Sequence, residues 1–220
     1  MPRRALIEKR PMLLASLAAA MAFCALRLTA LPELWLVALP GLATGFLALY
    51  AWLRKTGRDG ALLAVMMAVA ALRDIVLQID LAVSALLFFA YHLLAMVLYL
   101  RHPRERTTAS QKAAAVAMLL LTPALAWLLP ADRGLEPAVA LYGLALGGMA
   151  SCAWMSAFPR YRVGIGAALF LASDLLLIAG RGPLMGDSLP DTLVWPMYYV
   201  GQFLITVGAV HTLRRRSARA

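Results

Sequence analysis

The 220-residue sequence predicts an all-α, polytopic integral membrane protein with about eight transmembrane helices, and three observations support this fold class. The first is composition: 63% of the residues are hydrophobic, whereas soluble domains are about 45–50% apolar. The second is spacing, because the apolar residues form blocks of about 20, the length that crosses roughly 30 Å of hydrocarbon. The third is the asymmetric placement of basic residues in the loops. No stretch is long and polar enough for a separate soluble domain, so we expect a single transmembrane domain over residues 1–220.

Eight apolar blocks account for the expected helices, and short loops join them. The blocks lie near residues 12–27, 34–53, 60–79, 81–100, 112–130, 137–157, 162–180 and 192–212. The first block follows a basic segment, so a signal peptide is an alternative interpretation, although no clear small-residue cleavage site follows it. The second and sixth blocks contain glycines four residues apart, Gly41 with Gly45 and Gly143 with Gly147. Such pairs favour close packing of helices.

Positive charge predicts the orientation of these helices. A net charge of +10 could indicate nucleic-acid binding, but the basic residues gather in alternate loops, as the positive-inside rule describes. Counting Lys and Arg in the loops and at the ends of the blocks gives 17 on the side of the two termini and three on the other, which are Arg27, Arg133 and Arg181. We therefore expect both termini in the cytoplasm, a multi-pass protein of a bacterial cytoplasmic membrane, and no nucleic-acid partner.

The two halves of the chain also align weakly with each other. Residues 65–79 laid over residues 165–179 align Asp74 with Asp174, and the same offset of 100 residues aligns Tyr99 with Tyr199. This register predicts a four-plus-four repeat, with the site between the repeats as in many membrane proteins. A chance alignment between apolar helices is the alternative.

Two aspartates inside the apolar blocks are the strongest functional signal. Asp74 and Asp174 both lie toward the non-cytoplasmic ends of their blocks. An ionisable group at bilayer depth costs roughly 2.5–3.5 kcal/mol, so such groups are usually functional. A carboxyl group held away from water can stay protonated near neutral pH and act as a proton donor. Hydrogen-bonded structural contacts between helices are the alternative.

Other polar residues of the blocks complete a candidate pocket. His92, Tyr198, Tyr199 and Gln202 lie at or just below the expected depth of the two aspartates, and we predict that they bind substrate there. Tyr198 facing lipid is an alternative. Arg73 precedes Asp74, so the two side chains leave a helix about 100° apart and should not pair well. Arg73 could instead extend toward the interface, meet a carboxylate on another span or bind a lipid phosphate.

Other classes of chemistry find little support in the sequence. His92 is the only histidine deep in a block, whereas a zinc hydrolase needs about three converging ligands. No Ser or Cys stands in a recognisable nucleophile motif, and Cys24 and Cys152 fall inside blocks as packing residues do. We therefore expect no metal and no cofactor, and carboxylate acid/base chemistry remains.

Several segments resemble the YhhN family of lysoplasmalogenase-like membrane proteins. They are FFAYHLLAMVLYL (88–100), PAVALYGLALGGMASCAWMSA (137–157), GAALFLASDLLLIAG (166–180) and YYVGQFLITVG (198–208). The resemblance extends from about Leu34 onward. The chain departs from the family pattern at three positions: Arg73 replaces a Gly, Leu39 replaces the Lys of a Lys-Pro pair, and Tyr91 replaces a small residue before the His. The lost basic residue bears on headgroup or carboxylate pairing, and Arg73 is a candidate replacement.

The resemblance implies an ether hydrolase that cleaves the vinyl ether bond of a lysoplasmalogen. The products would be a fatty aldehyde and a glycerophospho-ethanolamine or -choline, and Asp74 and Asp174 would be the catalytic pair. Asp174, whose sequence neighbours are neutral, is the expected acid. Arg181, Asp187 and Asp191 are weaker candidates for headgroup contact. The expected partners are the lysophospholipid substrate and membrane lipids. A proton-coupled transporter of small molecules or lipids and a non-catalytic lipid-binding protein are the alternatives.

Overall fold

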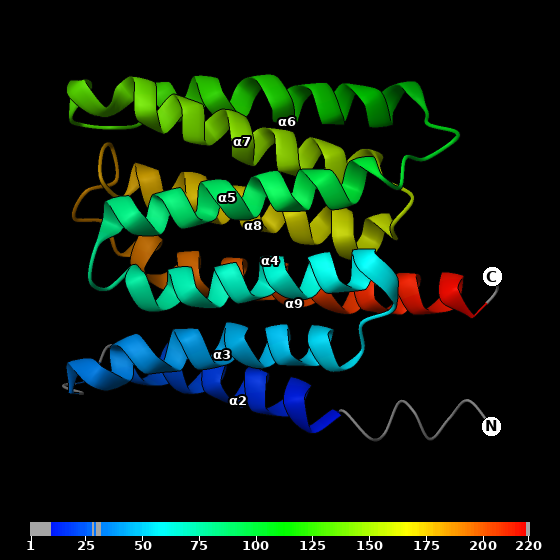
Figure 1. Cartoon of the computed structure of the whole chain (residues 1–220). Helices are drawn as coiled ribbons and strands as arrows, with labels where there is room; N and C mark the ends of the chain where they lie inside the picture. Colours follow the sequence, from blue (N-terminus) through cyan, green and yellow to red (C-terminus); the bar gives the residue numbers. More distant parts are fainter. Residues whose placement is uncertain (1–9, 28, 30–31, 219–220) are drawn as a thin grey trace. The chain divides into compact units, whose positions relative to one another are not determined.

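The computed structural model describes residues 10–27, 29 and 32–218, and the regular elements of these residues are helices (Figure 1). The expected all-α fold class is thus confirmed. The chain divides into two compact units, Met1–Tyr91 with Leu213–Ala220, and His92–Thr212. Two helices, α5 (Leu81–Leu100) and α9 (Ser188–Ser217), contribute residues to both units.

The first unit contains α2 (Arg10–Leu26), α3 (Glu33–Leu53) and α4 (Gly57–Val76), with α3 packed against both neighbours (Figure 1). Ser16 of α2 donates a buried hydrogen bond of 2.6 Å to the carbonyl of Ala43 in α3. Gly41 lets α3 approach α4, since a Cβ there would lie only 2.4 Å from Ile75 Cγ1. Gly41 is thus a packing position, as the sequence predicts, whereas a Cβ on Gly45 would meet its nearest atom at 4.0 Å.

The second unit contains α6 (Ala109–Leu128), α7 (Glu136–Met155) and α8 (Ile165–Ala179), preceded by a π-helical turn at Arg160–Gly164. Glycines set the closest approaches here too. A Cβ on Gly147 of α7 would lie 2.5 Å from the carbonyl oxygen of Met118 in α6. Gly166 of α8 and Gly201 of α9 face each other, because a Cβ on either would lie 2.7 Å from the other's carbonyl oxygen. The same contact therefore fixes the register of α8 against α9.

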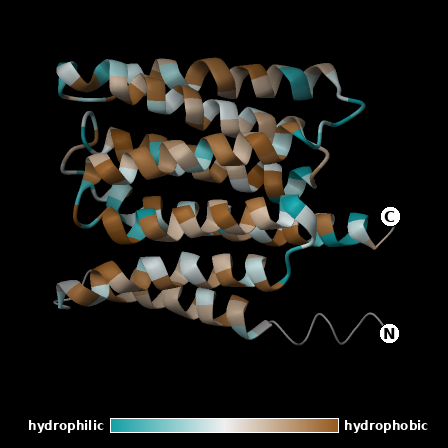
Figure 2. Ribbon diagram, in the orientation of Figure 1, coloured by the Kyte–Doolittle hydropathy of each residue, from teal (hydrophilic) through white to brown (hydrophobic). Residues whose placement is uncertain are grey.

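Six helical segments of the described residues are long and apolar enough to cross a membrane: Leu34–Leu53, Leu81–Leu100, Ala109–Leu128, Arg133–Met155, Arg160–Ala179 and Ser188–Ser217. Figure 2 shows apolar residues along these helices and hydrophilic residues in the loops that join them. The other two expected spans correspond to α2, which has 17 residues, and α4, which contains four charged residues. The exact number of spans, their orientation, the repeat and the single domain stay predictions.

The largest differences from the expected helix ends are at α9, which runs over Ser188–Ser217 instead of 192–212, and the ends of α4 are shifted as well. The sequence predicts a span over residues 60–79, but α4 runs over Gly57–Val76, and a turn follows. Asp80 begins α5, because its Oδ1 accepts from the backbone N–H groups of Ala82 and Val83 at 2.8 and 3.0 Å. Capping by an Asp side chain is typical of helix N-termini. Asp74 consequently lies only two residues before the end of its helix.

Candidate functional site

Asp74 is almost completely buried and has a donor on each carboxylate oxygen. Its exposed fraction is 1%. Thr44 Oγ1, on α3, donates to Oδ2 at 2.8 Å, and Arg73 Nη1 lies 3.0 Å from Oδ1. Hydrogen bonds from a hydroxyl and a guanidinium to one carboxylate are the charge-assisted kind, which are stronger than neutral ones. Asp74 is therefore held in a fixed orientation in the first unit.

The ion pair between Arg73 and Asp74 corrects the expectation that these neighbours do not pair. The reason is the length of the Arg side chain: its guanidinium can return to the neighbouring carboxylate although the two Cα–Cβ bonds diverge. The same guanidinium lies 3.8 Å from the ring centroid of Phe88, and Arg73 as a whole is 6% exposed. A weakly hydrated guanidinium tolerates such stacking better than an ammonium would. Arg73 is thus a buried partner of Asp74, which excludes extension to the interface in this structure.

Asp174 is held by a different set of partners in the second unit. The hydroxyl of Tyr142, on α7, donates to Asp174 Oδ2. His92 Nε2, on α5, lies 3.4 Å from the same hydroxyl. Asp174 is 3% exposed and His92 is fully buried. His92, Tyr142 and Asp174 therefore form one hydrogen-bonded series across three helices.

Sequence reasoning missed Tyr142, although the sequence contained a signal for it. Tyr142 stands five residues after Pro137, the start of the expected sixth span, and Asp174 stands six residues before the end of the expected seventh. Both ends face the predicted non-cytoplasmic side, so the two side chains share a depth. The rule that selected Tyr198 and Tyr199 would have selected Tyr142 as well.

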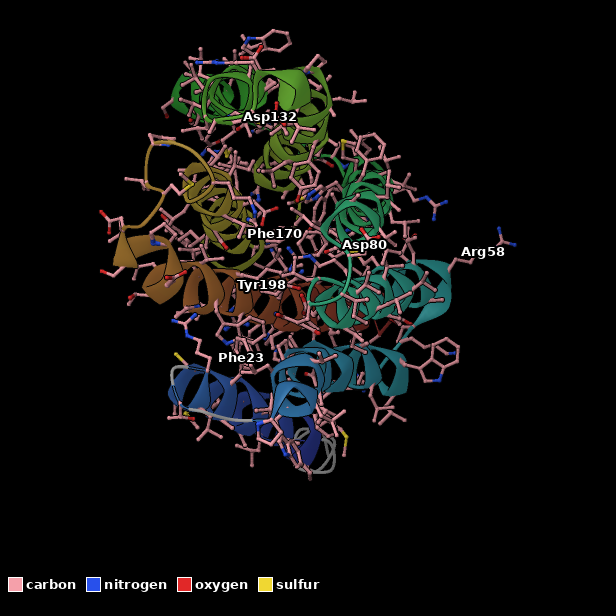
Figure 3. The ribbon with its side chains drawn as sticks, turned by 90° about the vertical axis from the view of Figure 1, so that its left-hand side faces the viewer. Phe23, Arg58, Asp80, Asp132, Phe170 and Tyr198 are labelled. Atoms are coloured by element: carbon pink, nitrogen blue, oxygen red, sulfur yellow. The ribbon has the colours of Figure 1, made fainter. Side chains whose placement is uncertain are left out.

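Aromatic side chains surround the Asp174 series. Phe170, one turn before Asp174 on α8, lies 5.3 Å from the His92 ring centroid and 5.3 Å from that of Tyr198 (Figure 3). Tyr198 is 2% exposed, so the alternative that it faces lipid is wrong. Trp195 and Tyr199, four residues apart on α9, stack with centroids 6.1 Å apart and planes at 21°. These rings give the second unit a largely apolar surrounding for its carboxyl group.

Hydroxyl groups near Asp174 fix the helices. Ser173 Oγ donates to the carbonyl of Val194 at 2.8 Å, so this hydroxyl joins α8 to α9 and points away from its neighbour Asp174, as expected. Thr206 Oγ1 donates to the carbonyl of Gln202 at 2.8 Å within α9. Gln202 itself is fully buried. The segment of α9 that contains the two tyrosines and Gln202 is therefore firmly anchored to α8.

The predicted catalytic and substrate-binding residues are all buried, and they fall in the two units, whereas the weaker headgroup candidates Arg181, Asp187 and Asp191 are exposed. Arg73 and Asp74 belong to the first unit, whereas the others belong to the second, namely His92, Asp174, Tyr198, Tyr199 and Gln202. A pocket shared by both aspartates stays a prediction. Over the described part of the chain, the structure contains no group of three or more His, Cys, Asp or Glu side chains that could hold a metal ion.

The six long apolar helical segments of the described residues indicate a multi-pass membrane protein, and it contains two buried aspartates. The family model of the YhhN family matches residues 35–209, and the chain belongs to this family. Neither a search of curated proteins nor a search of solved structures finds a match. The expected family is thus confirmed, and the match covers both aspartates and Tyr142.

Proposed function

We propose that this protein is a membrane-embedded hydrolase that cleaves the vinyl ether bond of a lysoplasmalogen, with Asp74 and Asp174 as its catalytic pair. One observation supports the proposal above others: the two buried aspartates have unlike hydrogen-bond donors. Here a hydroxyl and a cation hold Asp74, and a Tyr–His series holds Asp174.

The chemistry requires one acid and one group that stabilises positive charge. Asp174 in its protonated form delivers a proton to the β-carbon of the vinyl ether, and the double bond becomes an oxocarbenium ion. Water adds to the cationic carbon and loses a proton, which returns to the carboxylate. The resulting hemiacetal then breaks its bond to the glycerol oxygen, its hydroxyl proton passes to that oxygen, and a fatty aldehyde and a glycerophospho-ethanolamine or -choline leave. General acid catalysis of this kind contributes typically 10²–10⁴-fold.

The different surroundings of the two carboxyl groups support this division of roles. Asp74 is paired with a guanidinium, so it suits the carboxylate that faces the developing cation. Asp174 receives a neutral phenol and lies among aromatic rings, so it suits the acid. Two carboxyl groups in unlike environments perform the same two roles in glycoside hydrolysis. The apolar alkenyl chain would lie along the helices.

In this proposal, Arg73 takes the place of a basic residue that the family pattern has at another position. Leu39 stands where the resemblance leads us to expect Lys, one helix away from Arg73 in the first unit. The structure brings the Arg73 guanidinium to Asp74 at 3.0 Å. The positive charge that the chain lacks at residue 39 is thereby supplied from α4. The departure at residue 73 is then compatible with catalysis.

Mass spectrometry of the products tests the proposal. The purified protein is incubated with a panel of ether and ester lysolipids in detergent, and we expect fatty aldehyde only from those with a vinyl ether. Asp174→Asn should lose this activity while its melting temperature stays close to that of the wild type. Asp132→Asn is the matched control, because Asp132 is an exposed loop residue whose Oδ1 accepts from Gly134 N–H, as an Asn oxygen also can (Figure 3).

Two results would oppose the proposal. Full activity of a folded Asp174→Asn variant would refute the role of that residue. The absence of aldehyde from every vinyl ether substrate would refute the hydrolase itself. In that case, proton-coupled uptake into proteoliposomes would favour a transporter, and a lysolipid that co-purifies without turnover would favour a lipid-binding protein.

A further inference from the structure

A second group of polar residues lies at the opposite end of α8 from Asp174, where two loops of the second unit meet. Two backbone hydrogen bonds join these loops: Arg104 N–H donates to Met155 O at 3.2 Å, and Ala157 N–H donates to His102 O at 2.7 Å. The Arg104 side chain adds two more, from Nε to Ser156 O at 3.0 Å and from Nη2 to the carbonyl of Phe158 at 2.8 Å. Arg104 is therefore fixed by the backbone of the α7–α8 loop.

Arg160 lies beside this loop at the first position of the π-helical turn. Its Nε donates to the Trp154 carbonyl at 3.4 Å, and its guanidinium carbon lies 5.4 Å from the Trp154 ring centroid. Gly164 allows this packing, because a Cβ there would lie 3.0 Å from the Trp154 ring and 3.1 Å from Arg160 Cγ. Single π-helical turns inside α-helices frequently occur at functional sites. The turn and the glycine thus press Arg160 against the indole ring.

The positive charges and some hydrogen-bond donors of Arg104, Arg160 and Trp154 lack compensating partners. Burial, and next the positive charge of Arg160, lower the pKa of Arg104 below its usual value. Arg160 Nη2 and the indole Nε1 of Trp154 are buried without a hydrogen-bond partner among the residues that the structure describes. Within those residues, no ion pair joins either arginine to a carboxylate. Two adjacent cations and two buried donors without acceptors are each unfavourable, and an anion with several acceptor oxygens offsets both.

We propose that Arg160, Arg104 and Trp154 form a binding site for a phosphate group. Two oxygens of a phosphate group can accept side by side from the N–H groups of a planar guanidinium. Tyr161 is 85% exposed and Arg162 is exposed on the same turn, at the predicted cytoplasmic end of the span. Aromatic and basic residues together are typical of the membrane interface, where lipid phosphates lie. The phosphate comes either from a lipid headgroup or from solution.

This site is distinct from the candidate catalytic site and does not depend on the proposed hydrolysis. Arg160 and Asp174 are 14 residues apart, which is about 21 Å along a helix. In a lysoplasmalogen, the vinyl ether and the phosphate are attached to one glycerol. A substrate whose vinyl ether reaches Asp174 therefore keeps its own phosphate away from Arg160. The phosphate site would hold a second molecule, at the other end of α8.

Binding measurements on the full-length protein test the site with two probes. Native mass spectrometry in detergent measures retention of phosphatidylglycerol, and isothermal titration measures binding of inorganic phosphate. We expect Arg160→Gln to weaken binding of at least one probe about tenfold or more, as the loss of one charged hydrogen bond predicts. Arg162→Gln, which removes the same charge from an exposed neighbour, should change it less than about twofold. Trp154→Phe keeps an aromatic ring at this position but removes the indole N–H, and it should weaken binding in the same assay.

The outcome also identifies the source of the phosphate. An effect confined to phosphatidylglycerol assigns the site to a lipid headgroup, whereas an effect on inorganic phosphate assigns it to a soluble phosphate. The site is overturned if neither probe binds, or if Arg160→Gln and Arg162→Gln weaken binding equally. If Arg160→Gln does not fold, as a melting curve would show, unchanged binding by Trp154→Phe overturns the site instead.

Discussion

Replacing Tyr142 by Phe removes one hydroxyl group and keeps the aromatic ring. The hydroxyl donates to Asp174 and lies 3.4 Å from His92 Nε2, so the change breaks the middle of that series. The ring itself packs edge-on against His92 with centroids 5.4 Å apart, and Phe retains this contact. The substitution therefore tests the hydrogen bonds separately from the packing of α7.

The expected magnitude follows from the partner of the hydroxyl. In the proposed step Asp174 becomes negative as it gives up its proton, and a hydrogen bond to a charged group contributes about 1.5–3 kcal/mol. If Tyr142 orients Asp174 for proton transfer, the loss appears in the transition state, and kcat/KM falls about 10- to 150-fold. Release of fatty aldehyde from a lysoplasmalogen measures this change. Infrared spectra supply a readout beyond activity, because the C=O band of a carboxyl group rises in frequency when it loses a donor, and Asp174→Asn identifies the band.

Tyr99 provides a matched control for this prediction. It lies on α5, is 1% exposed, and its hydroxyl has no hydrogen-bond partner among the residues described. Tyr99→Phe thus deletes a buried hydroxyl that holds no catalytic group, and we expect activity within about twofold of the wild type. If Tyr142→Phe also keeps full activity and leaves the carboxyl band unchanged, Tyr142 does not position Asp174, and the reasoning fails.

Two further predictions concern the catalytic pair and the packing of the helices. Asp74→Asn and Asp174→Asn should each lower kcat/KM by about 10²–10⁴-fold. The double variant should lose less than about tenfold more than either single variant, because the effects of groups that act in one step are not additive. A loss in the double variant equal to the product of the two single losses would contradict a shared reaction. Gly147→Ala should lower the free energy of unfolding by about 1–3 kcal/mol, since its Cβ would lie 2.5 Å from Met118 O. Gly45→Ala, whose Cβ meets its nearest atom at 4.0 Å, should be neutral or stabilising in the same denaturation assay, and equal effects of the two would refute the packing argument.

The hydrophobic pattern predicted the ends of the helices well where polar residues flank the helix. The spans expected over 34–53 and 81–100 agree with α3 and α5 to within a residue. The end of α4 was wrong by three residues, because Leu77 and Ile79 continue the apolar pattern beyond the end of the helix. Hydropathy indicates the environment of a side chain and does not indicate where the backbone leaves the helical conformation. Only the Asp80 cap, a polar residue between two apolar blocks, marked the turn in the sequence.

For the candidate site, the burial of the residues could be predicted from the sequence, but their hydrogen-bond partners could not. A polar residue inside an apolar block has a high free-energy cost when it faces lipid, so burial of the candidate residues was predictable. Their partners were not, because Thr44 and Tyr142 reach the carboxyl groups from other helices, and contact between helices depends on their rotation and register. Register here follows from glycine contacts such as Gly166 with Gly201, which a single sequence shows only as small residues. Arg73 was mispredicted for a related reason, since the direction of a Cα–Cβ bond does not fix the position of a guanidinium.

The unlike partners of the two aspartates bear directly on the proposed chemistry. Protonation of a vinyl ether converts a neutral substrate into a cation, so the acid must be neutral before the step and the second carboxyl must be negative during it. The Arg73 guanidinium lies 3.0 Å from Asp74 and brings a positive charge to it, whereas the phenol of Tyr142 brings no charge to Asp174. Symmetric surroundings would favour the same protonation state for both groups and leave one role unfilled. The substitution of Arg at residue 73, which departs from the family pattern, therefore strengthens the difference between the carboxyl groups that the reaction needs.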